Sequence, residues 1–153
     1  MSTEQEVNAR RKSDILSLHR YFIWSNRMRV HFDQILQRGG SRGDLNSREG
    51  IEEFLYLSYW YGGLHVVIEG WQKLDLHDPD VDRLLDSPNV GLLRRYRNGA
   101  FHYQSTYLDG RFVNFFAQEG TAGWVRELTE ALSTFFLRWA RQNKQDLPSE
   151  TKS

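Results

Sequence analysis

The sequence contains no cysteine among its 153 residues. This absence excludes a disulfide framework, thiolate zinc sites and a cysteine nucleophile, and it is typical of a cytosolic protein. No stretch of about 18 apolar residues is available for a transmembrane helix. The polar N-terminus, MSTEQEVNARRKSD, also lacks the apolar segment of a signal peptide. We therefore expect a cytoplasmic chain without a membrane segment.

Net charge is also missing, because 20 basic residues balance 20 acidic ones. A neutral chain is a poor candidate for coating nucleic acid by bulk electrostatics, although a local basic site stays open. Lysine is scarce, and 16 of the 20 basic residues are arginine. Arginine is the better bidentate partner for phosphate or carboxylate, but the same bias also fits a GC-rich genome.

Aromatic and apolar residues are abundant, at 14% and 39% of the chain. This content is enough for one compact core, and the length suits one domain. We expect a single helical domain over residues 13–142, between a flexible N-terminus (1–12) and a flexible C-terminal tail (143–153). The sequence contains no internal repeat.

The spacing of apolar residues predicts four main helices, over residues 13–37, 47–73, 88–103 and 121–142. The second is apolar on most sides and should be the central, buried helix. One short helical turn is expected in the connector DLHDPDVDRLLDSP. Alternation around Asp109-Gly110 predicts a hairpin. The predicted fold is an all-α bundle of four to five helices with a short β-hairpin between the last two main helices.

One helical segment, RRYRNGAFHYQ at residues 94–104, contains three arginines, an asparagine and a histidine close together. On a helical projection the apolar stripe comprises Leu92, Leu93, Tyr96, Ala100 and Tyr103. The opposite side carries Arg94, Arg95, Asn98 and His102.

Arg97 falls at the edge of the buried stripe, where an unpaired charge is costly, so it should have a partner. The best candidate is Glu69 on the central helix, with His65 one turn before it. A guanidinium, an imidazole and an amide in one groove suit phosphodiester cleavage. The imidazole moves a proton near neutral pH, and the guanidinium holds the charge that develops on phosphorus.

The run from Arg97 to His102 resembles the hallmark of the HEPN superfamily, small all-helical domains with an Arg, four to six residues and a His. The polar slot after the Arg holds Asn98, and residues 50–140 are similar to uncharacterised HEPN-type proteins. Members that are neutralised by nucleotide transfer carry Tyr two residues after the His. That position is Gln104 here, and Tyr103 comes one residue early, so the resemblance does not extend to that regulation.

The resemblance implies an endoribonuclease that needs no metal and no cofactor and works in a groove between two subunits. His102 would be the general base or acid, Arg97 the transition-state clamp and Asn98 the orienting group. Substrate contacts would come from Arg94, Arg95 and Tyr103, with Glu69 and His65 in support. The implied partners are RNA, a second copy of the chain and, since many members are toxins or defence proteins, an antitoxin protein.

Two alternatives stay open at this stage. A catalytically silent HEPN-type module would use the same basic groove to bind RNA, a nucleotide or a protein. A plain helical interaction protein would have surface arginines, and Arg97 with Glu69 would then be a structural pair.

Overall fold

The computed structural model describes residues 2–144 and contains six helices there and no strand, which confirms the all-α prediction. The helices are α1 (Ser2–Gln37), α2 (Arg48–Lys73), α3 (Pro79–Leu85), α4 (Asn89–Phe101), α5 (Gly110–Ala117) and α6 (Thr121–Gln142). None of these helices is both long and apolar enough to cross a membrane.

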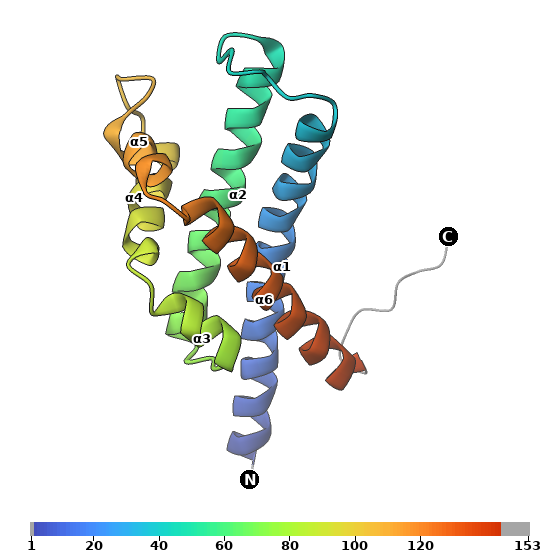
Figure 1. Cartoon of the computed structure of the whole chain (residues 1–153). Coiled ribbons are helices and arrows are strands. Elements are labelled where there is room, and N and C mark those ends of the chain that lie inside the picture. The colour runs from blue at the N-terminus through green and yellow to red at the C-terminus, as the bar shows by residue number, and fades with distance from the viewer. Residues whose placement is uncertain (1, 145–153) are drawn as a thin grey trace.

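Helices α1 and α2 form a long antiparallel pair (Figure 1). The loop between them reverses the chain with three glycines and Arg42 at positive φ, a conformation that costs glycine little. Glu53 of α2 fixes this loop, because its carboxylate accepts hydrogen bonds from the Ser41 backbone N–H (2.6 Å) and hydroxyl (2.8 Å). Ser47 then caps α2 by accepting from the backbone N–H of Gly50.

Helix α2 is the centre of the core, as its composition predicts. Its largest fully buried side chains are Trp60, Leu64, Ile68 and Trp71. Gly63 allows α1 to approach closely, because a Cβ there would lie 3.1 Å from the Cβ of Ser25.

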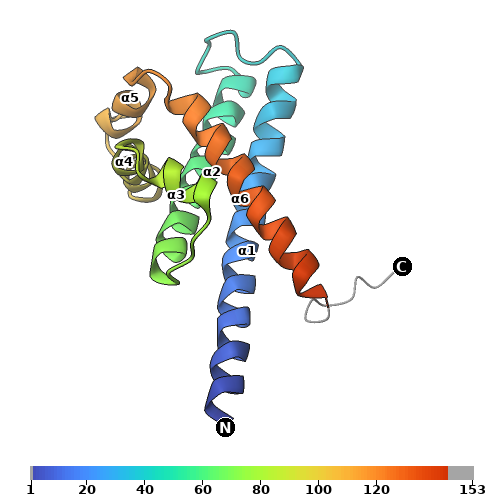
Figure 2. The same ribbon diagram turned by 60° about the horizontal axis from the view of Figure 1, so that its bottom comes forward.

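Helix α6 crosses obliquely over the pair of α1 and α2 (Figure 2). Its inward face buries Trp124, Leu128, Leu132 and Phe136. The indole N–H of Trp124 donates to the Leu84 carbonyl at the end of α3 (2.9 Å). The crossing leaves α4 free to pack on the other side of α2, and this position of α4 determines the candidate site.

The first helix begins earlier than predicted, at Ser2 instead of Ser13. Residues before Ser13 include Glu, Gln, Ala, Arg and Lys, which all favour helix, so nothing stops the helix from extending. Arg11 also contacts the end of α2, where its guanidinium donates to the Leu74 carbonyl (3.1 Å). Met1 of the predicted flexible N-terminus, and the C-terminal tail from residue 145, lie outside the described residues.

The predicted hairpin around Asp109-Gly110 is wrong, and helix α5 stands in its place. Asp109 caps α5 by accepting from the backbone N–H of Arg111 (2.9 Å). The following apolar residues also have helical spacing, since Phe112 and Phe115 are both buried. The cap by Asp109 and the helical spacing of the buried phenylalanines therefore outweigh the alternation that predicted a hairpin.

Candidate active site at the end of helix α4

Helix α4 is oriented by its buried tyrosine. Tyr96 is fully buried, and its hydroxyl hydrogen-bonds to the Ser58 hydroxyl of α2 (2.9 Å). Burial raises the pKa of Tyr96 above its ordinary value, so the phenol stays protonated. With Tyr96 anchored, the next residue, Arg97, lies at the edge between α4 and α2.

The predicted partner of Arg97 is confirmed. Its Nη1 donates to Oε1 of Glu69 at 2.6 Å, and its Nη2 donates to Oδ1 of Asn98 at 3.3 Å. The Arg97 side chain is 24% exposed and that of Glu69 is 48% exposed. The guanidinium is therefore held from two sides while part of it still faces solvent.

His65 lies beneath this pair, as the sequence predicts. Its Nδ1 is 3.5 Å from Oε1 of Glu69, and its side chain is only 3% exposed. This nitrogen has no hydrogen-bond partner among the described residues. Burial, followed by the positive charge of Arg97, lowers the pKa of His65 to about 4, although Glu69 acts in the opposite direction. His65 is therefore neutral at pH 7.

Helix α4 ends at Phe101, two residues before the predicted end. His102 adopts an extended conformation (φ −118°, ψ 133°), and its backbone N–H donates to the Asn98 carbonyl (3.2 Å). Of the residues predicted on the polar side of this helix, Arg94, Arg95 and Asn98 therefore lie on α4, whereas His102 follows its end. The apolar stripe also ends early, because Tyr103 is 94% exposed.

The His102 side chain is exposed and has no hydrogen bond or ion pair within residues 3–144. No hydrogen bond joins it to Arg97 in that part of the chain. One copy thus presents a fixed guanidinium and, just beyond the end of the same helix, a free imidazole. Contacts within residues 2–144 of one copy therefore do not bring Arg97 and His102 together in the expected groove.

Arg94 and Arg95 of α4 are both exposed. The charge of Arg94 acts on His65, whereas that of Arg95 acts on Asp109 of the α5 cap. Both arginines line a hollow of about 510 Å³ at the start of α4, together with Gln118. They can contact a phosphate of the substrate as it approaches the site, but they are not part of the ion pair between Arg97 and Glu69.

Arg111 was missed by the sequence reasoning. Its guanidinium donates to the side chains of Gln104 and Asp109, both at 3.0 Å. Gln104 in turn donates to the His102 carbonyl (3.1 Å). Arg111 thereby orders the loop that carries His102. The signal was present, since Asp109 two residues before Arg111 has the pattern of a helix cap.

An exposed apolar patch adjoins the motif. It comprises Ile51, Leu55 and Tyr59, spaced four residues apart on α2, and Phe101 at the end of α4; they are 53%, 44%, 54% and 43% exposed. The rings of Tyr59 and Phe101 pack edge to face with centroids 5.5 Å apart. Gly62 makes room for Phe101, because a Cβ there would lie 2.5 Å from the ring. We call these four residues the α2–α4 patch.

The arrangement combines a fixed cation, an amide and a free imidazole, a set suited to proton transfer and to stabilising negative charge. Within residues 2–144 no group of three or more His, Asp or Glu side chains is placed to hold a metal ion. Comparison of the chain with models of known protein families, with curated proteins and with solved structures finds no match.

Proposed function

We propose that the chain is a metal-independent endoribonuclease of the HEPN type, acting as a homodimer in the cytoplasm. One observation carries the proposal: the Arg97 guanidinium is held by Glu69 and Asn98, with an exposed imidazole, His102, just beyond the same helix. A preorganised guanidinium and a free imidazole supply the two functions needed to cleave a phosphodiester without a metal, which are charge stabilisation and proton transfer.

The reaction is transfer of the phosphodiester to the neighbouring ribose hydroxyl. The 2′-oxygen attacks phosphorus, the bond from phosphorus to the 5′-oxygen breaks, and the products are a 2′,3′-cyclic phosphate and a 5′-hydroxyl end. One proton leaves the 2′-hydroxyl and another reaches the 5′-oxygen. Arg97 stabilises the charge on the phosphoryl oxygens, and the exposed imidazole of His102 transfers a proton.

Two copies explain the chemistry better than one. A single imidazole cannot accept one proton and donate another in the same step, whereas two His102 side chains from two copies can share these tasks. The α2–α4 patch offers an apolar surface beside the motif, and exposed apolar surface of this kind marks interaction sites. A dimer built on this patch would place both motifs next to one interface.

A binding module without catalysis is the second candidate, and a specific observation favours it. Glu69 neutralises the charge of Arg97, and nothing among residues 3–144 fixes the tautomer of His102. Such a site would bind a ribose or phosphate oxygen of RNA without cleaving the RNA. An antitoxin protein would be a natural partner for the enzyme and is not required by the module.

The test is cleavage of a mixed RNA pool in EDTA by the wild type, His102→Ala and Arg97→Ala, with analysis of the product ends. His77→Ala is the matched control, because His77 is exposed on the connector before α3, away from the motif. We expect cyclic-phosphate ends from the wild type and from the control. Both site variants should lose cleavage by about 10²-fold or more, which is the usual contribution of a general acid or base for His102 and of charge stabilisation for Arg97.

The outcomes separate the candidates. Equal cleavage by the wild type and His102→Ala would contradict the proposed mechanism. RNA binding without cleavage by any protein, at matched folding, would establish the binding module. Absence of both would leave the Arg97–Glu69 pair as part of the fold.

A further inference from the structure

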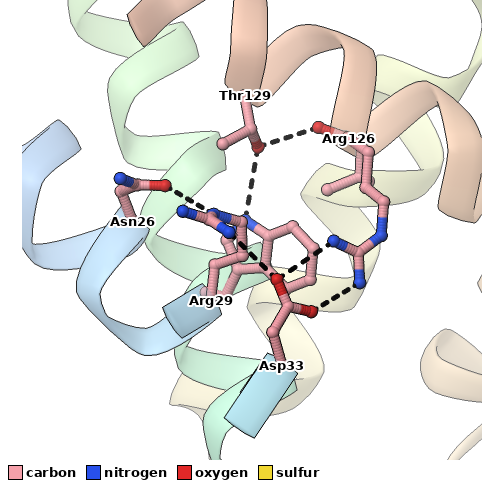
Figure 3. Close-up of polar contacts among 7 residues, drawn as sticks. Asn26, Arg29, Asp33, Arg126 and Thr129 are labelled. Carbon is pink, nitrogen blue, oxygen red and sulfur yellow. Dashed lines mark hydrogen bonds and ion pairs between the residues drawn. The ribbon is translucent and has the colours of Figure 1, made fainter. Parts of the chain in front are cut away.

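A second polar site lies between α1 and α6 and shares no residue with the α4 site. A pocket of about 360 Å³ opens there, lined by Asn26, Arg29, Arg126, Thr129, Glu130 and Ser133. Figure 3 shows how the polar side chains of the two helices converge. A pocket of this volume falls in the range of small-molecule sites.

Asp33 organises the positive end of this pocket. Its carboxylate accepts from both terminal nitrogens of Arg126 (2.7 and 3.3 Å) and from Nη1 of Arg29 (2.9 Å) (Figure 3). Partial burial alone would raise the pKa of Asp33, but the hydrogen bonds and charges of Arg126 and Arg29 outweigh it and lower the pKa. Asp33 is therefore ionised at neutral pH and keeps two cations side by side.

Contacts with Trp60 and within α6 fix the side of the pocket that carries Arg126. The Arg126 guanidinium lies over the Trp60 ring, 5.2 Å from its centroid. The Trp60 indole donates to the Thr129 hydroxyl (3.3 Å), which donates to the Val125 carbonyl (2.8 Å). These contacts hold α6 and its arginine in position, so a ligand would have little ordering to do.

Several polar groups in the pocket have unused hydrogen-bonding capacity. Arg29 uses Nε on Asn26 and Nη1 on Asp33, which leaves its Nη2 available. Arg126 uses both terminal nitrogens on Asp33, which leaves its Nε. On α6, one and two turns after Arg126, the carboxylate of Glu130 and the hydroxyl of Ser133 have no hydrogen bond or ion pair in the part of the chain that the structure describes.

The pocket presents charges of both signs. Two guanidiniums and Asp33 leave one net positive charge, and Glu130, one turn after Arg126 on α6, supplies one negative charge. A complementary ligand carries one negative and one positive group on a small frame. The six lining residues are all polar, which favours a polar side chain over an apolar one.

We propose that this pocket binds a small zwitterion, a free α-amino acid with a polar side chain. Its carboxylate would accept from Nη2 of Arg29 and from Nε of Arg126, the guanidinium nitrogens that Asn26 and Asp33 leave available. Its ammonium group would face Glu130. The pocket is independent of the proposed RNase chemistry, since no residue is shared.

The test is calorimetric titration of the full chain with L-serine and L-glutamine, up to about 10 mM. Three probes dissect the recognition: 3-hydroxypropanoate lacks the ammonium group of serine, ethanolamine lacks its carboxylate, and inorganic phosphate tests a simple anion site. L-leucine tests the preference for a polar side chain. We expect binding of serine or glutamine, and affinities at least about tenfold weaker for all other compounds.

Two variants and a control assign the binding to the pocket. Glu130→Gln and Arg126→Gln should each weaken amino-acid binding by about tenfold or more. Arg138→Gln is the control, because Arg138 ties α6 to Asp78 of the α3 cap (2.6 Å) and lies outside the pocket. Equal binding of phosphate or 3-hydroxypropanoate, no effect of Glu130→Gln, or no binding of either amino acid would each overturn the proposal.

Discussion

Nη1 of Arg97 lies 2.6 Å from Oε1 of Glu69, so an ion pair joins two helices across 28 residues of sequence. The pair fixes the orientation of the one guanidinium that the proposed chemistry needs. It also cancels much of the charge of that guanidinium before a substrate arrives. A site built in this way favours preorganisation over attraction of the substrate, and its approach relies on the exposed Arg94 and Arg95.

The substitution Glu69→Gln tests whether the ion pair serves to orient the Arg97 guanidinium. The amide still accepts from Arg97, so we expect the free energy of unfolding to change by less than about 1 kcal/mol, as for other exposed ion pairs. RNA cleavage should fall by about tenfold, because the guanidinium is held less firmly. Urea unfolding and cleavage rates measure the two effects. Glu127→Gln, on the exposed face of α6, is the control.

A loss of about 3 kcal/mol or more in Glu69→Gln would contradict this view and make the pair a structural tie. Arg97→Lys adds a second comparison, because lysine keeps the charge and loses the fork that bonds Glu69 and Asn98 together. If orientation matters more than charge, Arg97→Lys should be nearly as inactive as Arg97→Ala.

His65 should make the fold sensitive to mild acid. Its pKa is lowered to about 4 in the fold, whereas an unfolded histidine titrates near 6.5. Between these values the unfolded chain binds more protons, so the free energy of unfolding falls as pH decreases from 6.5 toward 4. The expected loss from this group between pH 7 and pH 5 is about 2 kcal/mol. Urea titrations at the two pH values measure it.

His65→Gln isolates the contribution of this one histidine. The variant should be less sensitive to the change from pH 7 to pH 5 by the amount that His65 contributes, whatever its stability at pH 7. The remaining sensitivity should come from groups such as His19, whose pKa burial also lowers. An unchanged pH dependence in His65→Gln would show that His65 binds a proton equally well in the folded and unfolded states, and would contradict a lowered pKa in the fold.

The long helices and the Arg97–Glu69 pair could be predicted from the sequence, because both follow from helical spacing. A charge at the edge of a buried stripe needs a partner, and Glu69 is an acid near the end of the otherwise apolar central helix. His65 followed from the same reasoning, since it lies one turn before Glu69.

The end of α4 could not be predicted in the same way. Angular projection assumes a continuous helix, but the chain turns extended at His102. Arg111, which holds the following loop through Gln104 and Asp109, belongs to helix α5, and that segment was expected to be a hairpin. The pocket around Asp33 escaped notice for another reason, since it depends on how α6 crosses α1 and not on any local pattern.

Two glycines on neighbouring helices should respond differently to alanine. Gly91 of α4 has open space around it, so Gly91→Ala should stabilise the fold by up to about 1 kcal/mol through its higher helix propensity. In Gly62→Ala the new Cβ meets the half-exposed Phe101 ring at 2.5 Å, and the ring must move. We expect little or no stabilisation there but reduced RNA cleavage, because Phe101 precedes His102. Thermal unfolding and cleavage of both variants provide the comparison.

The proposed dimer predicts that charge on the α2–α4 patch separates the copies. Leu55→Glu places a carboxylate in the middle of that patch, and an unpaired charge is costly to bury. We expect the wild type to sediment as a dimer, and Leu55→Glu to sediment as a monomer with unchanged unfolding and reduced RNA cleavage. Leu137→Glu is the matched control, because Leu137 is 53% exposed on α6. A wild type that stays monomeric at high concentration, or a control that dissociates equally, would place the interface elsewhere and remove the reason for sharing His102 between two copies.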